Sequence, residues 1–129
     1  MDNSTKKILI VEDDQFLREF YQELLQSEGY NVEVAADGET GFNKAHNGGY
    51  DLLLLDIMLP KMDGMQILRE LKISPPQTPN KAMVMLTNLG QDVVVKQCFE
   101  MGAQGFLIKS AMNPDQVLAE IHSYLQKNS

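Results

Sequence analysis

The sequence predicts an α/β fold, a doubly wound parallel sheet of five strands with helices on both faces. Short apolar runs alternate five times with segments whose apolar residues recur at helical spacing. The run from Leu52 to Leu55 consists of leucine alone, which is typical of a strand buried on both faces, as in a parallel sheet under helices. Such alternation implies right-handed crossovers, so the expected order is a strand and then a helix, repeated five times.

The predicted strands are short runs of mostly aliphatic residues. By residue number they are 8–11, 32–35, 52–55, 82–86 and 106–108. Polar side chains directly follow several of these runs, at the carboxyl end of the strand. Open α/β sheets bind ligands in the crevice beyond those ends. The polar residues that follow the strands are therefore the first candidates for a functional site.

The first two helices have recognisable boundaries. Gly29 stands where the first helix is expected to end, and the turn Asp37-Gly38 precedes the second. The residues that define these two helices by their spacing are Phe16, Phe20, Leu24 and Leu25, and then Gly41, Phe42 and Ala45.

The last three helices are marked by caps and prolines. Asp63 is suited to cap the third helix, which must end before Pro75. The fourth helix ends near Gly102, and the fifth begins at Pro114, a good first-turn residue. Their apolar faces are predicted to be Ile67, Leu68 and Leu71; Val94, Val95, Cys98 and Phe99; and Val117, Leu118, Ile121 and Leu125.

Composition limits the classes of function. The 129 residues suit one domain, with a core at about 7–126, and we expect no output domain in this chain. A formal net charge of −7 argues against a grip on nucleic-acid backbones. One cysteine excludes an internal disulfide, and no apolar stretch reaches the length of a membrane span or signal peptide. We expect a soluble cytoplasmic protein that does not bind membranes.

Acids and a lysine follow three of the predicted strands. Glu12 and Asp13 end the first, Asp56 ends the third, and Lys109 ends the fifth. The first and third strands are neighbours at the switch point of the common doubly wound order, so the three carboxylates are expected to converge there and to repel one another without a cation. Mg²⁺ takes such oxygen ligands together with phosphate oxygens. Three acids and a lysine at strand ends therefore indicate a site for a divalent metal and a phosphoryl group. Lys109, as a point charge, and the hydroxyl of Thr87 are expected to reach the oxygens of that phosphoryl group.

Other polar residues have ordinary structural interpretations. Asp14 and Asp63 precede predicted helices and are expected to be helix caps. His46 and His122 have no second histidine or cysteine at metal-ligand spacing, so both are expected at the surface. Cys98 lies on the apolar side of its helix and is expected to pack there.

The chain resembles the receiver domain of two-component response regulators. The resemblance covers nearly everything from Lys7 to Leu125. It rests on four motifs in the order and spacing of that family: IVEDD at 10–14, LDIMLPKMDG at 55–64, LT at 86–87 and GAQGFLIK at 102–109. It implies a flavodoxin-like sheet with the strand order 2-1-3-4-5.

The resemblance also implies a role for each residue of the site. Asp56 would be the phosphoacceptor, attacking the phosphoryl group of a phosphohistidine on a sensor histidine kinase or a histidine phosphotransfer protein. Asp13, Asp56 and the backbone carbonyl of Met58 would bind Mg²⁺ directly, and Glu12 through a metal-bound water. Lys109 would pair with the phosphoryl oxygens.

By the same resemblance, Thr87 and Phe106 form a switch. Thr87 would move to hydrogen-bond the phosphoryl group and Phe106 would shift inward behind it, because a new charge of about −1.5 to −2 recruits the hydroxyl. The face of the fourth helix, fifth strand and fifth helix would then bind a downstream target. The protein would be a signalling domain that catalyses only its own phosphorylation and dephosphorylation. It would be a stand-alone receiver or the receiver of a larger regulator, and a monomer or a phosphorylation-dependent homodimer.

Three positions depart from the pattern of the family. Asn88 stands where a small residue is common, and its larger side chain is expected to narrow access to Asp56. Ser110 replaces a common proline, which affects the loop into the last helix. The pair Gln104-Gly105 lacks the acidic residues of receivers with winged-helix outputs, so their dimer interface is not expected.

Three other functions share parts of this pattern. A phosphatase of the haloacid-dehalogenase type needs a second aspartate two residues after the first, where this chain has Met58. A flavodoxin-like FMN-binding protein needs a Ser-, Thr- or Gly-rich phosphate loop after the first strand, where this chain has acids. A degenerate receiver that docks without phosphorylation would keep its cellular activity after Asp56→Asn.

Overall fold

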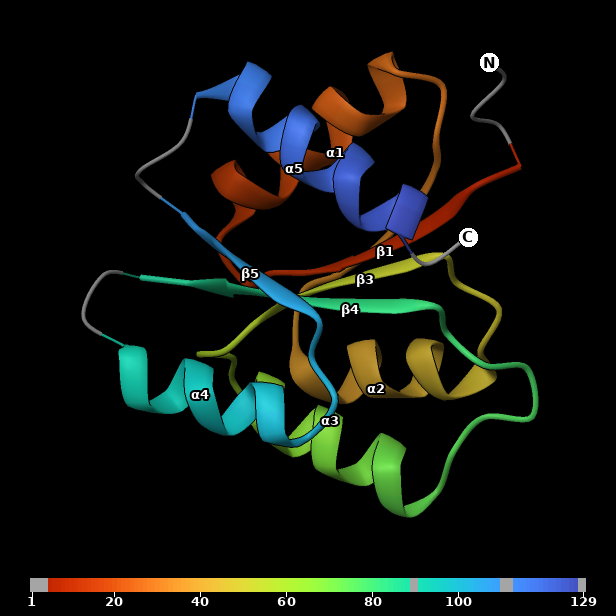
Figure 1. Ribbon diagram of the computed structural model, residues 1–129, viewed down its shortest axis with the longest axis vertical. Coiled ribbons are helices and arrows are strands. Elements are labelled where there is room, and N and C mark those ends of the chain that lie inside the picture. Colours follow the sequence, from red (N-terminus) through yellow and green to blue (C-terminus); the bar gives the residue numbers. More distant parts are fainter. Residues whose placement is uncertain (1–4, 89–90, 110–112, 128–129) are drawn as a thin grey trace.

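A computed structural model of the chain describes residues 5–88, 91–109 and 113–127. It contains one five-stranded sheet in which each pair of neighbouring strands is parallel, in the order β2-β1-β3-β4-β5 (Figure 1). The strands are β1 (Lys7–Val11), β2 (Asn31–Ala35), β3 (Leu52–Asp56), β4 (Ala82–Thr87) and β5 (Gly105–Ile108). The predicted fold class and strand order are confirmed.

Five helices cover the two faces of this sheet. They are α1 (Gln15–Ser27), α2 (Gly38–Asn47), α3 (Gly64–Ile73), α4 (Asp92–Glu100) and α5 (Pro114–Lys127). Figure 1 shows α1 and α5 on one face and α2, α3 and α4 on the other. Within the described residues, none of these helices is long and apolar enough to cross a membrane.

The central strands are buried on both faces, as the leucine run predicted. Leu52 and Leu54 pack in the cluster under α1 and α5, whereas Leu53 and Leu55 pack in the cluster under α2, α3 and α4. Successive side chains of a strand point to opposite faces, so a strand between two helical layers needs apolar residues at every position. The rigid sheet fixes where the next residue in the chain, Asp56, is presented.

Three aspartates cap helices, as expected for two of them. The carboxylates of Asp14, Asp37 and Asp63 accept backbone N–H bonds from the first turns of α1, α2 and α3. Asp63 also forms a reciprocal capping box with Gln66, whose side chain accepts the backbone N–H of Asp63. Each cap satisfies a backbone donor that the helix itself leaves unpaired.

Two aromatic residues that marked helices by their spacing are exposed, and one of them, Phe99, was predicted on an apolar face. Phe16 is 78% exposed, whereas Tyr21 and Leu25 form the buried side of α1. A helix turns about 100° per residue, so Phe16 lies about 140° around the axis from Tyr21. Phe99 is also exposed, while Cys98 beside it is fully buried, as predicted.

The two histidines differ in their surroundings. His46 is exposed, as expected. His122 on α5 is only partly exposed: its ring hydrogen-bonds the hydroxyl of Tyr30 and lies 3.5 Å from a carboxylate oxygen of Glu28. His122 therefore connects α5 to the residues at the end of α1. The sequence did not indicate this contact, because Tyr30 and Glu28 are far from His122 in the chain.

Candidate functional site

The site residues lie together because parallel strands end at the same edge of the sheet. Glu12 and Asp13 directly follow β1, Asp56 is the last residue of β3, and β1 and β3 are neighbours. Thr87 ends β4 and pairs with Ile108 of β5, so Lys109 emerges beside it. Each side chain was predicted at a strand end, and the strand order brings those ends together.

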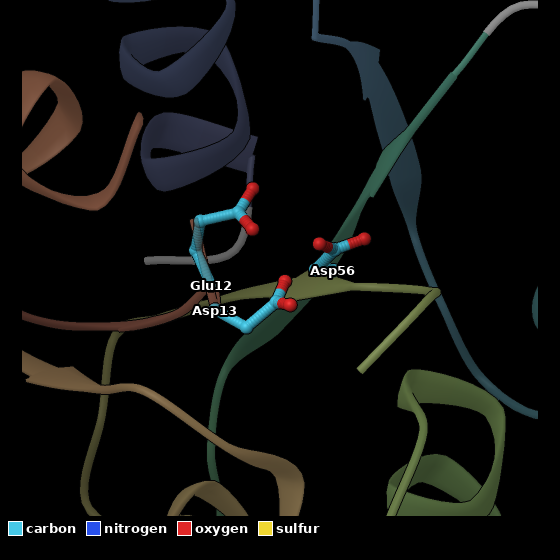
Figure 2. Close-up of side chains that lie close together, drawn as sticks. All are labelled: Glu12, Asp13 and Asp56. Atoms are coloured by element: carbon cyan, nitrogen blue, oxygen red, sulfur yellow. The ribbon is translucent and has the colours of Figure 1, made fainter. Parts of the chain in front are cut away.

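Three carboxylates face one another at this edge. Figure 2 shows the side chains of Glu12, Asp13 and Asp56 pointing toward a common space. One carboxylate oxygen of each lies within 4.8 Å of the others. Glu12 and Asp56 are buried and Asp13 is exposed, so the group has one side open to solvent. Such a group repels itself unless a cation joins it.

Lys109 contacts the two buried acids. Its Nζ lies 2.5 Å from Oδ2 of Asp56 and 2.7 Å from Oε1 of Glu12, and the lysine side chain is only 11% exposed. Burial alone would lower the pKa of Lys109, but its bonds to Asp56 and Glu12 outweigh burial and raise that pKa. The lysine therefore stays cationic at neutral pH.

One lysine does not balance three carboxylates. With all four groups ionised, a charge of −3 + 1 = −2 remains. Burial raises the pKa of Glu12, and Asp56 raises it further, while Lys109 opposes the shift. Uncompensated negative charge, and not merely desolvation, acts on this side chain.

Glu12 also has a buried oxygen that lacks a well-directed hydrogen bond. Its Oε2 accepts the backbone N–H of Asp14 at 3.1 Å. Its Oε1 lies 2.7 Å from Nζ of Lys109, yet among the described residues it has no partner of hydrogen-bond geometry. A buried oxygen of this kind is suited to a water molecule held by a metal ion. The donor set of carboxylate oxygens is also the one that Mg²⁺ prefers, so the residues fit that ion.

These side chains line an open cleft of about 500 Å³. Its lining residues are Glu12, Asp13, Asp14, Leu17, Asp56, Met58, Asn88 and Lys109. Asp56 lies at the floor, where Oδ1 accepts the backbone N–H of Met58 at 3.0 Å and Oδ2 meets Lys109. The carboxylate is thus held by two donors while facing the cleft.

The two expected switch residues are not among those that line this cleft. The hydroxyl of Thr87 lies 2.6 Å from Oε1 of Gln91, and its side chain is not among the groups that line the cleft. Phe106 is 40% exposed, and its ring meets the edge of Phe99 with centroids 6.1 Å apart. Gln91 was not singled out from the sequence, where it is only a polar residue before a helix.

The departures from the family pattern have different structural settings. Asn88 lines the cleft, at the position where its side chain was expected to narrow access. Gly105 lies against the ring of Tyr124, and a Cβ placed there would lie 2.1 Å from the phenol oxygen. Any larger residue at that point of β5 would require the ring of Tyr124 to move. Ser110 lies outside the described residues.

Comparison with known proteins places the chain in a family. The model of the response regulator receiver domain matches residues 8–122. The chain belongs to the response regulator receiver family. Receiver domains are phosphorylation-accepting signalling modules of two-component systems, and they interact with histidine kinases. The identification predicted from the four motifs is confirmed.

Curated relatives include two transcriptional regulatory proteins. CpxR of Escherichia coli is 38% identical over 122 residues, and DltR of Streptococcus agalactiae is 34% identical over 123 residues. These matches cover 95% of this chain but only 50% and 53% of the relatives. The chain spans about half the length of the curated relatives it matches.

Solved structures agree with the fold. A CheY-like receiver domain protein from Methanospirillum hungatei superposes with a TM-score of 0.83 at 30% identity, covering 95% of each chain. The receiver domain of the sensor histidine kinase PA1611 from Pseudomonas aeruginosa has a TM-score of 0.77 at 27% identity, covering 95% of this chain and 96% of that one. The latter was solved with a magnesium ion coordinated in its active-site cleft.

Proposed function

We propose that Asp56 accepts a phosphoryl group from a phosphohistidine. The observation that carries this proposal is the position of its carboxylate, which lies at the floor of an open cleft between two further acids and a lysine. Two hydrogen-bond donors, the backbone N–H of Met58 and the ammonium group of Lys109, hold that carboxylate. Its orientation is therefore set before the phosphohistidine arrives. Of the other two acids, Asp13 is exposed to solvent, and Glu12 is fully buried.

In the reaction, an oxygen of Asp56 attacks the phosphorus atom of the donor. A new P–O bond forms as the P–N bond to the donor imidazole breaks, and that ring nitrogen keeps the bonding electron pair. Lys109 lies beside the attacking carboxylate, and its ammonium group would pair with the phosphoryl oxygens. The product is an aspartyl phosphate on Asp56.

The residues that would hold Mg²⁺ are Asp13, Asp56 and the backbone carbonyl of Met58, with Glu12 acting through a metal-bound water. The unsatisfied Oε1 of Glu12 and the residual charge of the site support this set. When bound, the ion would offset the negative charge of the transferring phosphoryl group. Asp13 is the exposed member, so it would meet a hydrated ion first.

The outcome of phosphorylation would be a change of surface rather than turnover of a small substrate. Thr87 would turn toward the phosphoryl group and Phe106 would move inward, altering the face of α4, β5 and α5, where a downstream target would bind. The phosphodonor would be a sensor histidine kinase or a histidine phosphotransfer protein. The proposed setting is cytoplasmic, as a monomer or as a homodimer that forms on phosphorylation, without direct contact to nucleic acid or membrane.

The test is intact mass after incubation with Mg²⁺ and acetyl phosphate. We expect the wild type and the exposed control Asp115→Asn to gain one phosphoryl group, and Asp56→Asn to gain none. Gain by Asp56→Asn would move the acceptor to another residue. No gain by any variant, with acetyl phosphate or with a phosphorylated histidine phosphotransfer protein, would favour a module that docks without phosphorylation.

A further inference from the structure

The hydroxyl of Thr87 is already engaged by groups other than the carboxylates of the site. Thr87 is 3% exposed at the end of β4. Its Oγ1 lies 2.6 Å from Oε1 of Gln91 and 3.1 Å from the backbone carbonyl oxygen of Asn88. A hydroxyl has one hydrogen to donate, and the shorter contact assigns it to Gln91.

The same oxygen of Gln91 accepts a second donor. The backbone N–H of Asn88 lies 2.8 Å from Oε1, so two groups from the end of β4 converge on one side-chain oxygen. Gln91 occupies the N-cap position of α4, yet its side chain makes no capping bond to that helix. The side chain turns back instead and joins the start of α4 to the residues after β4.

We infer that Gln91 is a positioning residue that restrains Thr87 in the unphosphorylated protein; this inference rests on the proposed function. To donate to a phosphoryl oxygen on Asp56, Thr87 must give up the bond to Gln91, because it has only one hydroxyl hydrogen. Gln91 and the phosphoryl group thus compete for the same donor. Release of Thr87 also removes one of the two bonds that join Gln91 to Thr87 and Asn88. The loss of this bond transmits the change to the first turn of α4.

A bond that restrains Thr87 and a bond that only stabilises the fold predict different results. A bond that only stabilises the fold would change the unfolding free energy and leave the balance of phosphorylated and unphosphorylated protein unchanged. A competing acceptor acts on that balance, because it stabilises only the unphosphorylated arrangement. Its removal should favour phosphorylation, and the gain should depend on the hydroxyl of Thr87.

The first experiment reads the restraint without any phosphodonor. In Gln91→Met, which keeps the side-chain length but lacks the acceptor, the amide hydrogen of Asn88 should exchange faster with solvent and the methyl resonance of Thr87 should shift. Gln91→Glu keeps an oxygen at the same reach and should restore protection of Asn88. Gln97→Ala removes an exposed amide from the same helix and should change neither signal. Unchanged exchange in both Gln91→Met and Gln91→Ala would overturn the inference.

The second experiment measures the competition. Since one hydrogen bond contributes a small net free energy, Gln91→Met should reach half-phosphorylation at roughly two- to tenfold less acetyl phosphate than the wild type. In a Thr87→Val background, which has no hydroxyl, the same change should have no effect. An equal effect in both backgrounds, or no effect in either, would overturn the inference.

The two proposals fail in different ways. If the wild type gains no phosphoryl group on Asp56 from any donor, the proposed function fails, while the Asn88 amide exchange and the Thr87 methyl resonance still report whether Gln91 holds these two residues. If the wild type is phosphorylated and Gln91→Met shifts neither the exchange nor the half-point, the inference about Gln91 fails alone.

Discussion

Charged groups gather at two places on the same sheet in two very different ways. At the carboxyl ends of the strands, Glu12 and Asp56 share Lys109, and Asp13 lies beside them. On the edge strand β2, by contrast, the single carboxylate of Glu33 has several partners. We call this group the Glu33 cluster. Its members are Lys7 at 3.3 Å, Lys44 at 3.8 Å and the hydroxyl of Tyr50 at 3.1 Å.

The two groups differ in balance and in burial. The Glu33 cluster has one carboxylate and two lysines, all about one-third exposed, so water screens each ion pair and each contributes little. The site has an excess of acids, two of them almost inaccessible to water. Matched charge at the surface is typical of a structural contact. Unmatched, buried charge costs stability and is retained where a ligand completes it.

Replacing one lysine in each group should give the largest difference in the free energy of unfolding. Lys109→Met leaves two buried carboxylates without their cation, and breaking a buried ion pair in this way costs about 3 kcal/mol or more. Lys44→Met removes a screened partner of Glu33 and should cost less than about 1 kcal/mol. Urea unfolding of both variants in EDTA measures the difference. Similar costs would mean that the site is balanced by water rather than by Lys109.

Mg²⁺ should stabilise the protein through the acids of the site and not through the Glu33 cluster. At a Mg²⁺ concentration about a hundredfold above its dissociation constant, binding should stabilise the wild type by about 2.7 kcal/mol. Asp13→Asn should lose most of this gain, because it removes the exposed carboxylate of the site. Without metal the same change should be neutral or slightly stabilising, since it relieves repulsion.

The matched control for that experiment is Glu33→Gln. It removes a carboxylate from the other group, so it should lower stability slightly and leave the response to Mg²⁺ unchanged. Calorimetric titration with Mg²⁺ gives the affinities directly, and thermal unfolding with and without the ion gives the stability changes. If Asp13→Asn binds Mg²⁺ as tightly as the wild type, the metal ligands are assigned wrongly.

The sequence predicted the location of the acids well for a physical reason. Strand periodicity identified where β1, β3 and β5 end, and the parallel strand order then brings Glu12, Asp56 and Lys109 together. This inference needs only backbone geometry. Helix caps such as Asp63 were also predictable, because the cap and its partner are three residues apart in the chain.

Side-chain directions were less predictable. Helical spacing grouped Phe16 with the other apolar residues of α1, but its position around the helix axis leaves it in solvent. Gln91 carried no motif, and its bond to Thr87 depends on a rotamer that turns back from the helix. Gly105 was noted only as lacking an acid, whereas it makes room for a ring from α5, far along the chain. Such features depend on tertiary contacts that local pattern does not encode.

A further contrast, smaller than those expected at the site, concerns Tyr50 of the Glu33 cluster, and it depends on pH. Burial, followed by the hydrogen bond to Glu33, raises the pKa of Tyr50 to about 12. A phenol whose pKa is raised on folding binds its proton more tightly in the native state, so its contribution is complete below about pH 10 and is lost as the pH rises toward 12. Tyr50→Phe removes this contribution.

At pH 8, Tyr50→Phe should therefore be less stable than the wild type by about 1 kcal/mol, the usual net value of one hydrogen bond. The gap should close as the pH rises from 10 to 12, because in the wild type the phenol of Tyr50 ionises in the unfolded state over this range while it stays protonated in the native state. The other tyrosines are common to both proteins and cancel in the difference. Parallel stability curves over this range would show that Glu33 is held by its lysines alone, which would make the contrast with the site one of burial rather than of charge balance.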